Sequence, residues 1–293
     1  MNVLALEVGT SSVKAAVLEA GTCRPTGPTA RVELVLDRPA PEAAELSAER
    51  LWQTMTTASR EAVRRAGVAG TPRDVAGIGL AVFTPGLVLI DANERPLRPI
   101  WTHLDRRSRP VARQVWTAVG DEFLATTGNR PVPGGISVLS YRQMLQETPY
   151  LAHKVTGYLQ VNGWLGLRMT GEQAFDAANA SFTGLWSTTT DRTWSPRWCE
   201  YFEIDPAWLP PVRDGRDTIG TLRSAAAADL GVPAGIPVKL GAADTSCAML
   251  AVGMKPGDLL HVVGTTQLLA AFADPPQPSA KRASIQILTK LMR

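Results

Sequence analysis

Two short segments rich in glycine and hydroxyl residues are the best candidates for chemistry in this chain. They are Gly9, Thr10, Ser11 and Ser12, followed by Lys14, and further along Gly264, Thr265 and Thr266. In a turn, backbone N–H groups and hydroxyls can bind phosphate oxygens, and the glycine permits a close approach and a positive φ. One such segment alone is typical of an ordinary β-turn. Two matching segments favour phosphate binding.

The two segments belong to a longer internal repeat. Residues 4–19 align without a gap with residues 259–274, so that Gly264 lies 255 positions after Gly9. Apolar runs on both sides of a short polar turn indicate a β-hairpin. The separation is far longer than the period of a solenoid, which is about 20 to 50 residues. The repeat therefore predicts a duplicated fold with a site between its halves.

Strands and helices alternate around these turns. Residues 3–7 and 13–18 are expected to form the first hairpin, and residues 75–80 and 87–90 are dense in apolar and β-branched side chains typical of strands. Between them, a helix is expected from the partial N-cap Ser47 to residue 66. This alternation predicts an α/β fold.

The second half of the chain continues the alternation. Residues 110–170 are mainly helical in pattern, with a loop at 128–135, where prolines and glycines gather. A short helix at 225–230 and a strand at 237–240 follow. The glycines and proline of residues 253–257 are the best candidate for a domain boundary.

Composition excludes several classes of protein. The formal net charge is +3, but four basic residues fall in the tail 279–293, and the rest of the chain holds 26 basic and 27 acidic residues. This balance gives no electrostatic footprint for nucleic acid. The longest mostly apolar stretch, residues 77–90, contains Pro85 and is too short to span a membrane. With no basic leader at the N-terminus, a cytoplasmic protein is expected.

The cysteines and the tail complete this picture. Cys23, Cys199 and Cys247 are odd in number and far apart, so they offer neither a disulfide framework nor a metal site, and the three histidines also lack metal-ligand spacing. Two of the six lysines fall in the last thirteen residues. This shift in composition indicates either a frameshifted or foreign end, or simply a charged terminus.

The order of the motifs resembles the FGGY family of carbohydrate kinases, in the actin-like ATPase superfamily. The matching segments run from residue 1 to about 274 and are residues 7–14, 77–91, 105–107, 170–172, 176–181, 209–211, 241–244 and 264–266. The resemblance implies an actin-like (ribonuclease H-like) α/β kinase fold. Residues 1–252 would be the substrate-side N-terminal domain. Residues 253–293 would begin the ATP-side C-terminal domain, which is truncated here and carries the atypical tail 279–293.

The resemblance implies ATP-dependent phosphorylation of a sugar or polyol hydroxyl, with ATP and Mg²⁺ as cofactors. Asp244 matches the family's catalytic base, which accepts the proton of the attacking hydroxyl; without the resemblance it would be interpreted as a helix N-cap or first-turn acid. Residues 9–12, Lys14 and residues 264–266 match the two phosphate-binding hairpins, although Lys14 could simply point to solvent. Glu7 stands where the family usually has an aspartate near Mg²⁺, and its extra methylene alters the reach.

The resemblance also suggests which residues bind the sugar. Asp105 matches an acid that accepts hydrogen bonds from sugar hydroxyls, although with Arg106 and Arg107 it could equally form a surface ion pair. Either Trp101 or His103 lines the pocket, and Thr84 belongs to a Phe-Thr-Pro segment. This segment replaces the Gln-Met-His of xylulose kinases and the Gln-Arg-Glu of glycerol kinases, which disfavours both specificities.

Three interpretations follow for the whole chain. The first is a sugar kinase whose activity is impaired by the missing ATP-side elements, with a complementing C-terminal fragment or a homo-oligomer as a partner. The second is a non-catalytic sugar-binding or regulatory remnant. The third is a structural module that offers an unpaired, apolar sheet edge to another protein.

Overall fold

The first hairpin is present where the repeat predicts it. The structure is a computed structural model that describes residues 1–67, 74–262 and 268–271. Strands β1 (Asn2–Val8) and β2 (Ser12–Glu19) pair antiparallel over their full length. In β1, Leu4 and Leu6 are buried and Glu7 is exposed, as expected when alternate side chains point to opposite faces.

The main sheet extends this hairpin on both sides. Its strand order is β11-β12-β5-β1-β2-β3, and β13 also pairs with β5. The added strands are β3 (Ala30–Glu33), β5 (Val75–Val82), β11 (Thr218–Thr221), β12 (Pro237–Lys239) and β13 (Ala242–Ala243). Strands β1 and β13 both run parallel to β5. The carboxyl ends of these three strands therefore meet at one edge of the sheet.

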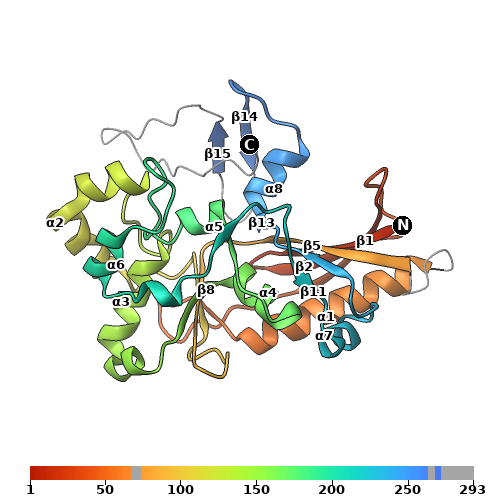
Figure 1. Cartoon of the computed structure of the whole chain (residues 1–293), viewed down its shortest axis with the longest axis horizontal. Helices are drawn as coiled ribbons and strands as arrows, with labels where there is room; N and C mark the ends of the chain where they lie inside the picture. Colours follow the sequence, from red (N-terminus) through yellow and green to blue (C-terminus); the bar gives the residue numbers. More distant parts are fainter. Residues whose placement is uncertain (68–73, 263–267, 272–293) are drawn as a thin grey trace.

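Three helices and the main sheet enclose one hydrophobic core. They are α1 (Ala48–Arg65), α4 (Val161–Thr170) and α7 (Ser224–Leu230), and Figure 1 shows them together below the strands of the sheet. The side chain of Ser47 accepts a hydrogen bond from the Arg50 backbone N–H, which confirms the predicted N-cap of α1. Helix α7 ends at Gly231 in the left-handed conformation, also as expected.

A second, smaller sheet carries its own core. Its order is β4-β7-β6-β8, formed by β4 (Glu45–Leu46), β7 (Ile100–Thr102), β6 (Gly86–Ile90) and β8 (Gly157–Gln160). Buried side chains of α2 (Arg109–Thr127), α3 (Ser137–Glu147) and α6 (Pro196–Phe202) complete this core. Strand β8 lies within the segment expected to be mainly helical. All four of its residues are buried, and so short a buried run lacks the alternation that identifies a strand.

The remaining elements are short. They are η3 (Pro149–His153), β9 (Phe175–Asp176), α5 (Ala177–Ser181), η4 (Pro206–Trp208), β10 (Val212–Arg213), α8 (Asp244–Ala251), β14 (Leu259–Val262) and β15 (Leu268–Ala271). Strands β14 and β15 pair antiparallel, which confirms the second predicted hairpin. Leu259 and Leu269 are exposed on it, and the expected unpaired, apolar sheet edge stays a prediction. The turn residues Gly264, Thr265 and Thr266 and the tail 279–293 lie outside the described residues.

The architecture confirms the expected α/β class. Gly253 and Gly257 adopt positive φ between α8 and β14, at the predicted domain boundary; the boundary itself stays a prediction.

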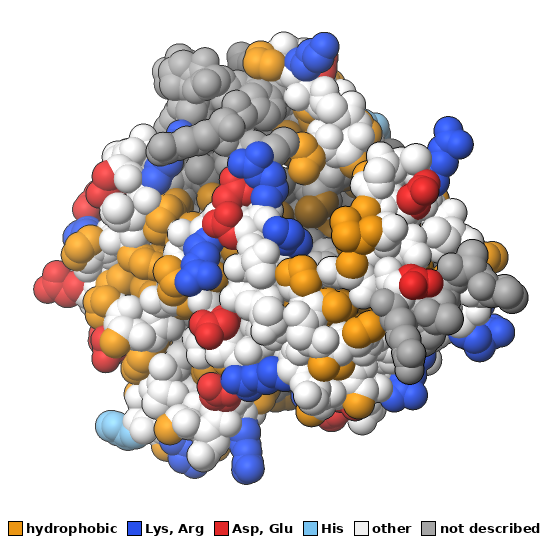
Figure 2. Space-filling model, turned by 45° about the vertical axis from the view of Figure 1, so that its right-hand side comes forward, with side chains coloured by type: hydrophobic (Ala, Val, Ile, Leu, Met, Phe, Trp, Pro, Cys, Tyr) orange, Lys and Arg blue, Asp and Glu red, His pale blue; other side chains and the backbone are white. Residues whose placement is uncertain are grey.

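Basic and acidic side chains are interspersed on the face drawn in Figure 2. Within the described ranges, no helix is long and apolar enough to cross a membrane.

Two glycines with positive φ, Gly241 directly before β13 and Gly235 before β12, should differ in how much an alanine substitution destabilises the protein. Gly241 (φ +68°) and Gly235 (φ +78°) both favour glycine, but a Cβ on Gly241 would lie 2.0 Å from the Leu80 carbonyl oxygen, whereas one on Gly235 meets nothing within 4 Å. We expect Gly235→Ala to lower the free energy of unfolding by about 1 kcal/mol and Gly241→Ala by ~3 kcal/mol or more. Urea denaturation measures both, and equal losses would contradict the steric argument.

Candidate active site

Three strand ends bring distant parts of the chain together. Val8 ends β1, Val82 ends β5, and Ala243, which pairs with Val82, ends β13. The Phe83 backbone N–H donates to the Val8 carbonyl oxygen at 2.7 Å, so the pairing continues into the loop. Gly9 and Asp244 directly follow β1 and β13, and Thr84 is the second residue after β5. Loops at the carboxyl ends of parallel strands are the usual place for a ligand in α/β proteins.

Asp244 is the first residue of α8 and is partly buried. The N-cap is Ala243, so the N-cap interpretation of Asp244 is wrong and the first-turn position is correct. Burial raises the pKa of Asp244, and the negative charge of Glu7 adds to this, while the Thr245 backbone N–H, at 2.6 Å, and Lys14 oppose it. A carboxylate with a raised pKa is a better proton acceptor.

Glu7 and Lys14 are cross-strand partners in the hairpin. The Lys14 Nζ lies 2.7 Å from Glu7 Oε1, and both side chains are nearly half exposed. Lys14 is therefore engaged with Glu7 instead of pointing freely into solvent. Among the described residues, no group of three or more His, Cys, Asp or Glu side chains could hold a metal. The Glu7 carboxylate still fits Mg²⁺, which commonly binds through one or two carboxylates with water and phosphate completing its shell.

The turn at residues 9–12 has a different glycine role from the one expected. Gly9 is not among the glycines with positive φ. A Cβ there would instead lie 3.2 Å from the Ser12 carbonyl oxygen, which accepts the Gly9 N–H at 3.0 Å. The close approach, and not φ, therefore explains the glycine. Ser12 is buried and Ser11 is exposed, so the hydroxyls of the turn differ in access.

Thr84 lies between two buried amide side chains that sequence analysis did not single out. Its Oγ1 is 2.8 Å from both Gln160 Oε1 and Asn179 Oδ1. Gln160 ends β8 and Asn179 lies in α5, and both are fully buried. The sequence does point to Asn179, because residues 176–181 are one of the segments that match the family. For Gln160 there was no signal, since β8 was not predicted.

Asp176 anchors the same polar cluster at the N-terminus of α5. Its carboxylate accepts from the Ala178 and Asn179 backbone N–H groups and from the side-chain amides of Asn162 and Asn179. Burial raises the pKa of Asp176 to about 6 although these donors oppose the change. Helices α5 and α8 both pack against β13, which places this cluster on the same side of the site as Asp244.

The remaining sugar-side residues differ in access. Asp105 forms the ion pair with Arg107 that was the alternative, but the pair is buried and does not lie on the surface; the Asp105 oxygens accept from the Ala44 N–H at 2.9 Å and from Arg107 at 2.7 Å. Arg107 also stacks over the Trp101 ring at 3.5 Å, and Trp101 is only 1% exposed. His103 is partly exposed and its ring lies 6.1 Å from that of Phe83, beside Thr84. Access therefore favours His103 over Trp101 as a pocket residue.

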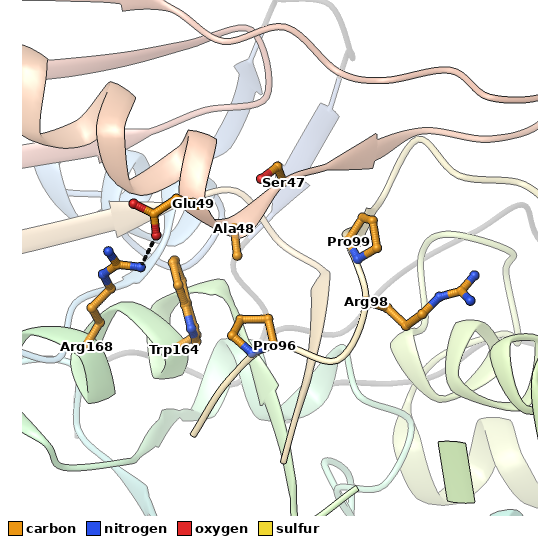
Figure 3. A pocket seen from close by; sticks show the side chains of 8 residues that line it. All are labelled: Ser47, Ala48, Glu49, Pro96, Arg98, Pro99, Trp164 and Arg168. Atoms are coloured by element: carbon orange, nitrogen blue, oxygen red, sulfur yellow. Dashed lines mark hydrogen bonds and ion pairs between the residues drawn. The ribbon is translucent and has the colours of Figure 1, made fainter. Parts of the chain in front are cut away.

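A cavity of about 250 Å³ lies elsewhere, between the start of α1, the 96–99 segment and α4. Figure 3 shows Glu49 and Arg168 joined along one side, at 2.7 Å, while Arg98 points away from them. Arg98 donates to Thr148 Oγ1 at 3.1 Å. None of the site residues predicted from the sequence lines this cavity. The strand ends are therefore the better candidate for the active site.

Comparison with known proteins identifies the class to which this fold and site belong. The sequence profile of the FGGY family of carbohydrate kinases, N-terminal domain, matches residues 2–251. The chain belongs to this family, which confirms the resemblance seen in its motifs. Within the family, it is similar to the xylulose kinases of Streptomyces coelicolor (28% identity over 268 residues) and Escherichia coli K12 (28% over 251 residues).

These relatives are longer than this chain. The two matches cover 90% and 86% of this chain but 53% and 50% of the relatives, so the chain spans about half their length. Among solved structures, the xylulose kinase of Rhodospirillum rubrum superposes with a TM-score of 0.88 at 24% identity, over 96% of this chain and 57% of that one. This likeness confirms the expected kinase fold.

The environment of His103 predicts a pH-dependent contribution to stability. Burial, with help from Arg106, lowers the pKa of His103 to about 4. Between pH 6.5 and 4 the unfolded state then binds more protons than the folded state, so the contribution of His103 to stability falls as the pH falls. We expect the free energy of unfolding of the wild type, relative to His103→Gln, to drop by about 2 kcal/mol between pH 7 and pH 4. Parallel pH profiles of the two proteins in urea denaturation would contradict the shift.

Proposed function

We propose that this protein takes part in ATP-dependent phosphorylation of a sugar or polyol hydroxyl, with Asp244 as the general base. The observation that carries the proposal is the place of Asp244, partly buried at the joint carboxyl ends of β1, β5 and β13 and near the charges of Glu7 and Lys14. Membership of a carbohydrate kinase family supports it. Because the chain spans about half the length of its relatives, the activity of the whole protein belongs to this proposal.

Each residue of the site has a distinct part in the proposed reaction. Asp244 accepts the proton of the attacking hydroxyl, and its raised pKa suits that role. The Lys14 ammonium and the turn at residues 9–12 neutralise and orient the transferred phosphoryl group, because this chemistry depends on positioning and electrostatics. Residues 264–266 complete the phosphate site in the proposal. When bound, Mg²⁺ would be held by Glu7 and would neutralise phosphate charge.

The sugar side is formed by Thr84 and His103, which are accessible, with Trp101 and Asp105 behind them. Asp105 and Arg107 make a buried ion pair. Arg107 also pairs with Glu45 on β4, at 2.7 Å. This pair holds the loop after β7 against β4, so it positions His103. Direct contact of Trp101 and Asp105 with the sugar stays a prediction.

A second candidate is a sugar-binding protein with little or no turnover. The ion pair between Glu7 and Lys14 favours it, because Glu7 binds Lys14 instead of a metal and Lys14 binds Glu7 instead of a phosphate. Both candidates share the sugar site and differ only in phosphoryl transfer. We place the protein in the cytoplasm because ATP is available there. The three free cysteines agree with a reducing compartment.

A substitution of Asp244 distinguishes the two candidates. Asp244→Asn keeps the size of the side chain and removes its basicity, so we expect ADP formation to fall about 10²- to 10⁴-fold while sugar affinity changes little. ADP release is measured with Mg²⁺–ATP and xylulose, xylitol, gluconate or glycerol, and affinity by calorimetry. Asp258→Asn, an exposed acid of the same segment, is the matched control.

The outcomes separate clearly. Turnover that is unchanged in Asp244→Asn would remove Asp244 from the role of base. Sugar binding without any ADP formation by the wild type would favour the second candidate. If no sugar of the panel binds, both candidates are wrong.

A further inference from the structure

The amide groups beside Thr84 have fixed orientations. Gln160 Nε2 donates to the backbone carbonyl oxygen of Asn179 at 2.9 Å, and Asn179 Nδ2 donates to the Asp176 carboxylate at 2.5 Å. Both partners are acceptors, so only an NH₂ group satisfies them. The oxygens of the two amides must therefore face Thr84, and neither amide can be flipped without losing a buried hydrogen bond.

This arrangement leaves three oxygens around one proton. Thr84 Oγ1 lies 2.8 Å from Gln160 Oε1 and 2.8 Å from Asn179 Oδ1, and a hydroxyl has a single hydrogen to donate. Whichever amide receives it, the proton of Thr84 is committed to the protein. Toward a ligand, Thr84 can act only as an acceptor.

The third amide of the cluster does not hydrogen-bond to the two amide oxygens. Asn162 is fully buried, its Nδ2 donates to Asp176, and its Oδ1 has no hydrogen-bond partner. A rearrangement that would free the Thr84 proton would need a further donor at these oxygens, and Asn162 makes no hydrogen bond to either of them. The buried network therefore fixes the Thr84 hydroxyl as a donor toward the protein and an acceptor toward a ligand.

Thr84 is also the member of this cluster that a ligand can reach. Gln160 and Asn179 are fully buried, whereas Thr84 is partly exposed. It follows the end of β5, which pairs with β13; Asp244 comes directly after β13, and α5 packs against β13. The cluster thus adjoins the proposed base.

We propose that Thr84, held by Gln160 and Asn179, selects substrates by the polarity of one oxygen. It accepts a hydrogen bond from a hydroxyl and rejects a carbonyl, an ether or a carboxylate at the same position, because these groups have no proton to donate. Gln160 and Asn179 are positioning residues, since they act through Thr84. The inference rests on the proposed function and narrows it to substrates with a free hydroxyl at that carbon.

The test combines one substitution with a series of ligands. Calorimetry with xylulose, xylitol, gluconate and glycerol first identifies the sugar that binds best, and its singly deoxygenated and O-methylated analogues are then compared. We expect one carbon at which both changes weaken wild-type binding about 10-fold. Thr84→Val should lose the same factor for the parent sugar and no longer discriminate at that carbon. Thr84→Ser, which keeps the hydroxyl, should bind within about 3-fold of the wild type.

Other results would overturn the inference. If Thr84→Val weakens the parent sugar and every analogue equally, or none of them, Thr84 has only a structural role and the proposed function still stands. If an O-methyl group is tolerated at every carbon, the acceptor polarity is wrong. If no sugar binds to the wild type, the proposed function fails and the inference fails with it. Melting temperatures confirm that each variant is folded.

Discussion

The parallel pairing of β5 with β1 on one side and β13 on the other is the constraint on which the site depends. It brings Gly9, Thr84 and Asp244 to one edge of the sheet, although they lie in three separate parts of the chain. The pairing of β13 begins directly after Gly241, whose positive φ lets the backbone pass the Leu80 carbonyl. The candidate base is therefore placed by backbone geometry, before any side-chain contact is considered.

Burial then gives the site its chemistry. Asp244 has a raised pKa because it is desolvated and lies near Glu7, whereas Asp105 is fully buried and surrounded by donors. A carboxylate whose hydrogen bonds are already satisfied within the protein is suited to holding a loop in place. One that keeps few donors and a nearby negative charge is suited to accepting a proton. The same residue type thus takes different roles at the two sides of the site.

Sequence analysis predicted the parts of this arrangement that local patterns encode. Both hairpins, the Ser47 cap and the position of Asp244 in the first turn of a helix follow from hydrophobic alternation, capping residues and motif order. The role of Gln160 could not be predicted, because β8 is a short buried run and its pairing with β6 is set by tertiary contacts. The same limit explains Gly9, where the reason for glycine is a carbonyl contact across the turn, and Asp105, whose burial depends on Ala44 and Glu45 on a distant segment.

The link between the two sheets explains why the polar cluster lies where it does. Strand β5 belongs to the main sheet and β6 to the smaller one, and Thr84 is in the short connection between them. Gln160 comes from the end of β8 in the smaller sheet, and Asn179 comes from α5, which packs against β13 of the main sheet. One threonine hydroxyl is therefore held from both sheets at once. A shift of either core would move one amide oxygen away from Thr84, so the polarity of this position depends on the two sheets keeping their relative place.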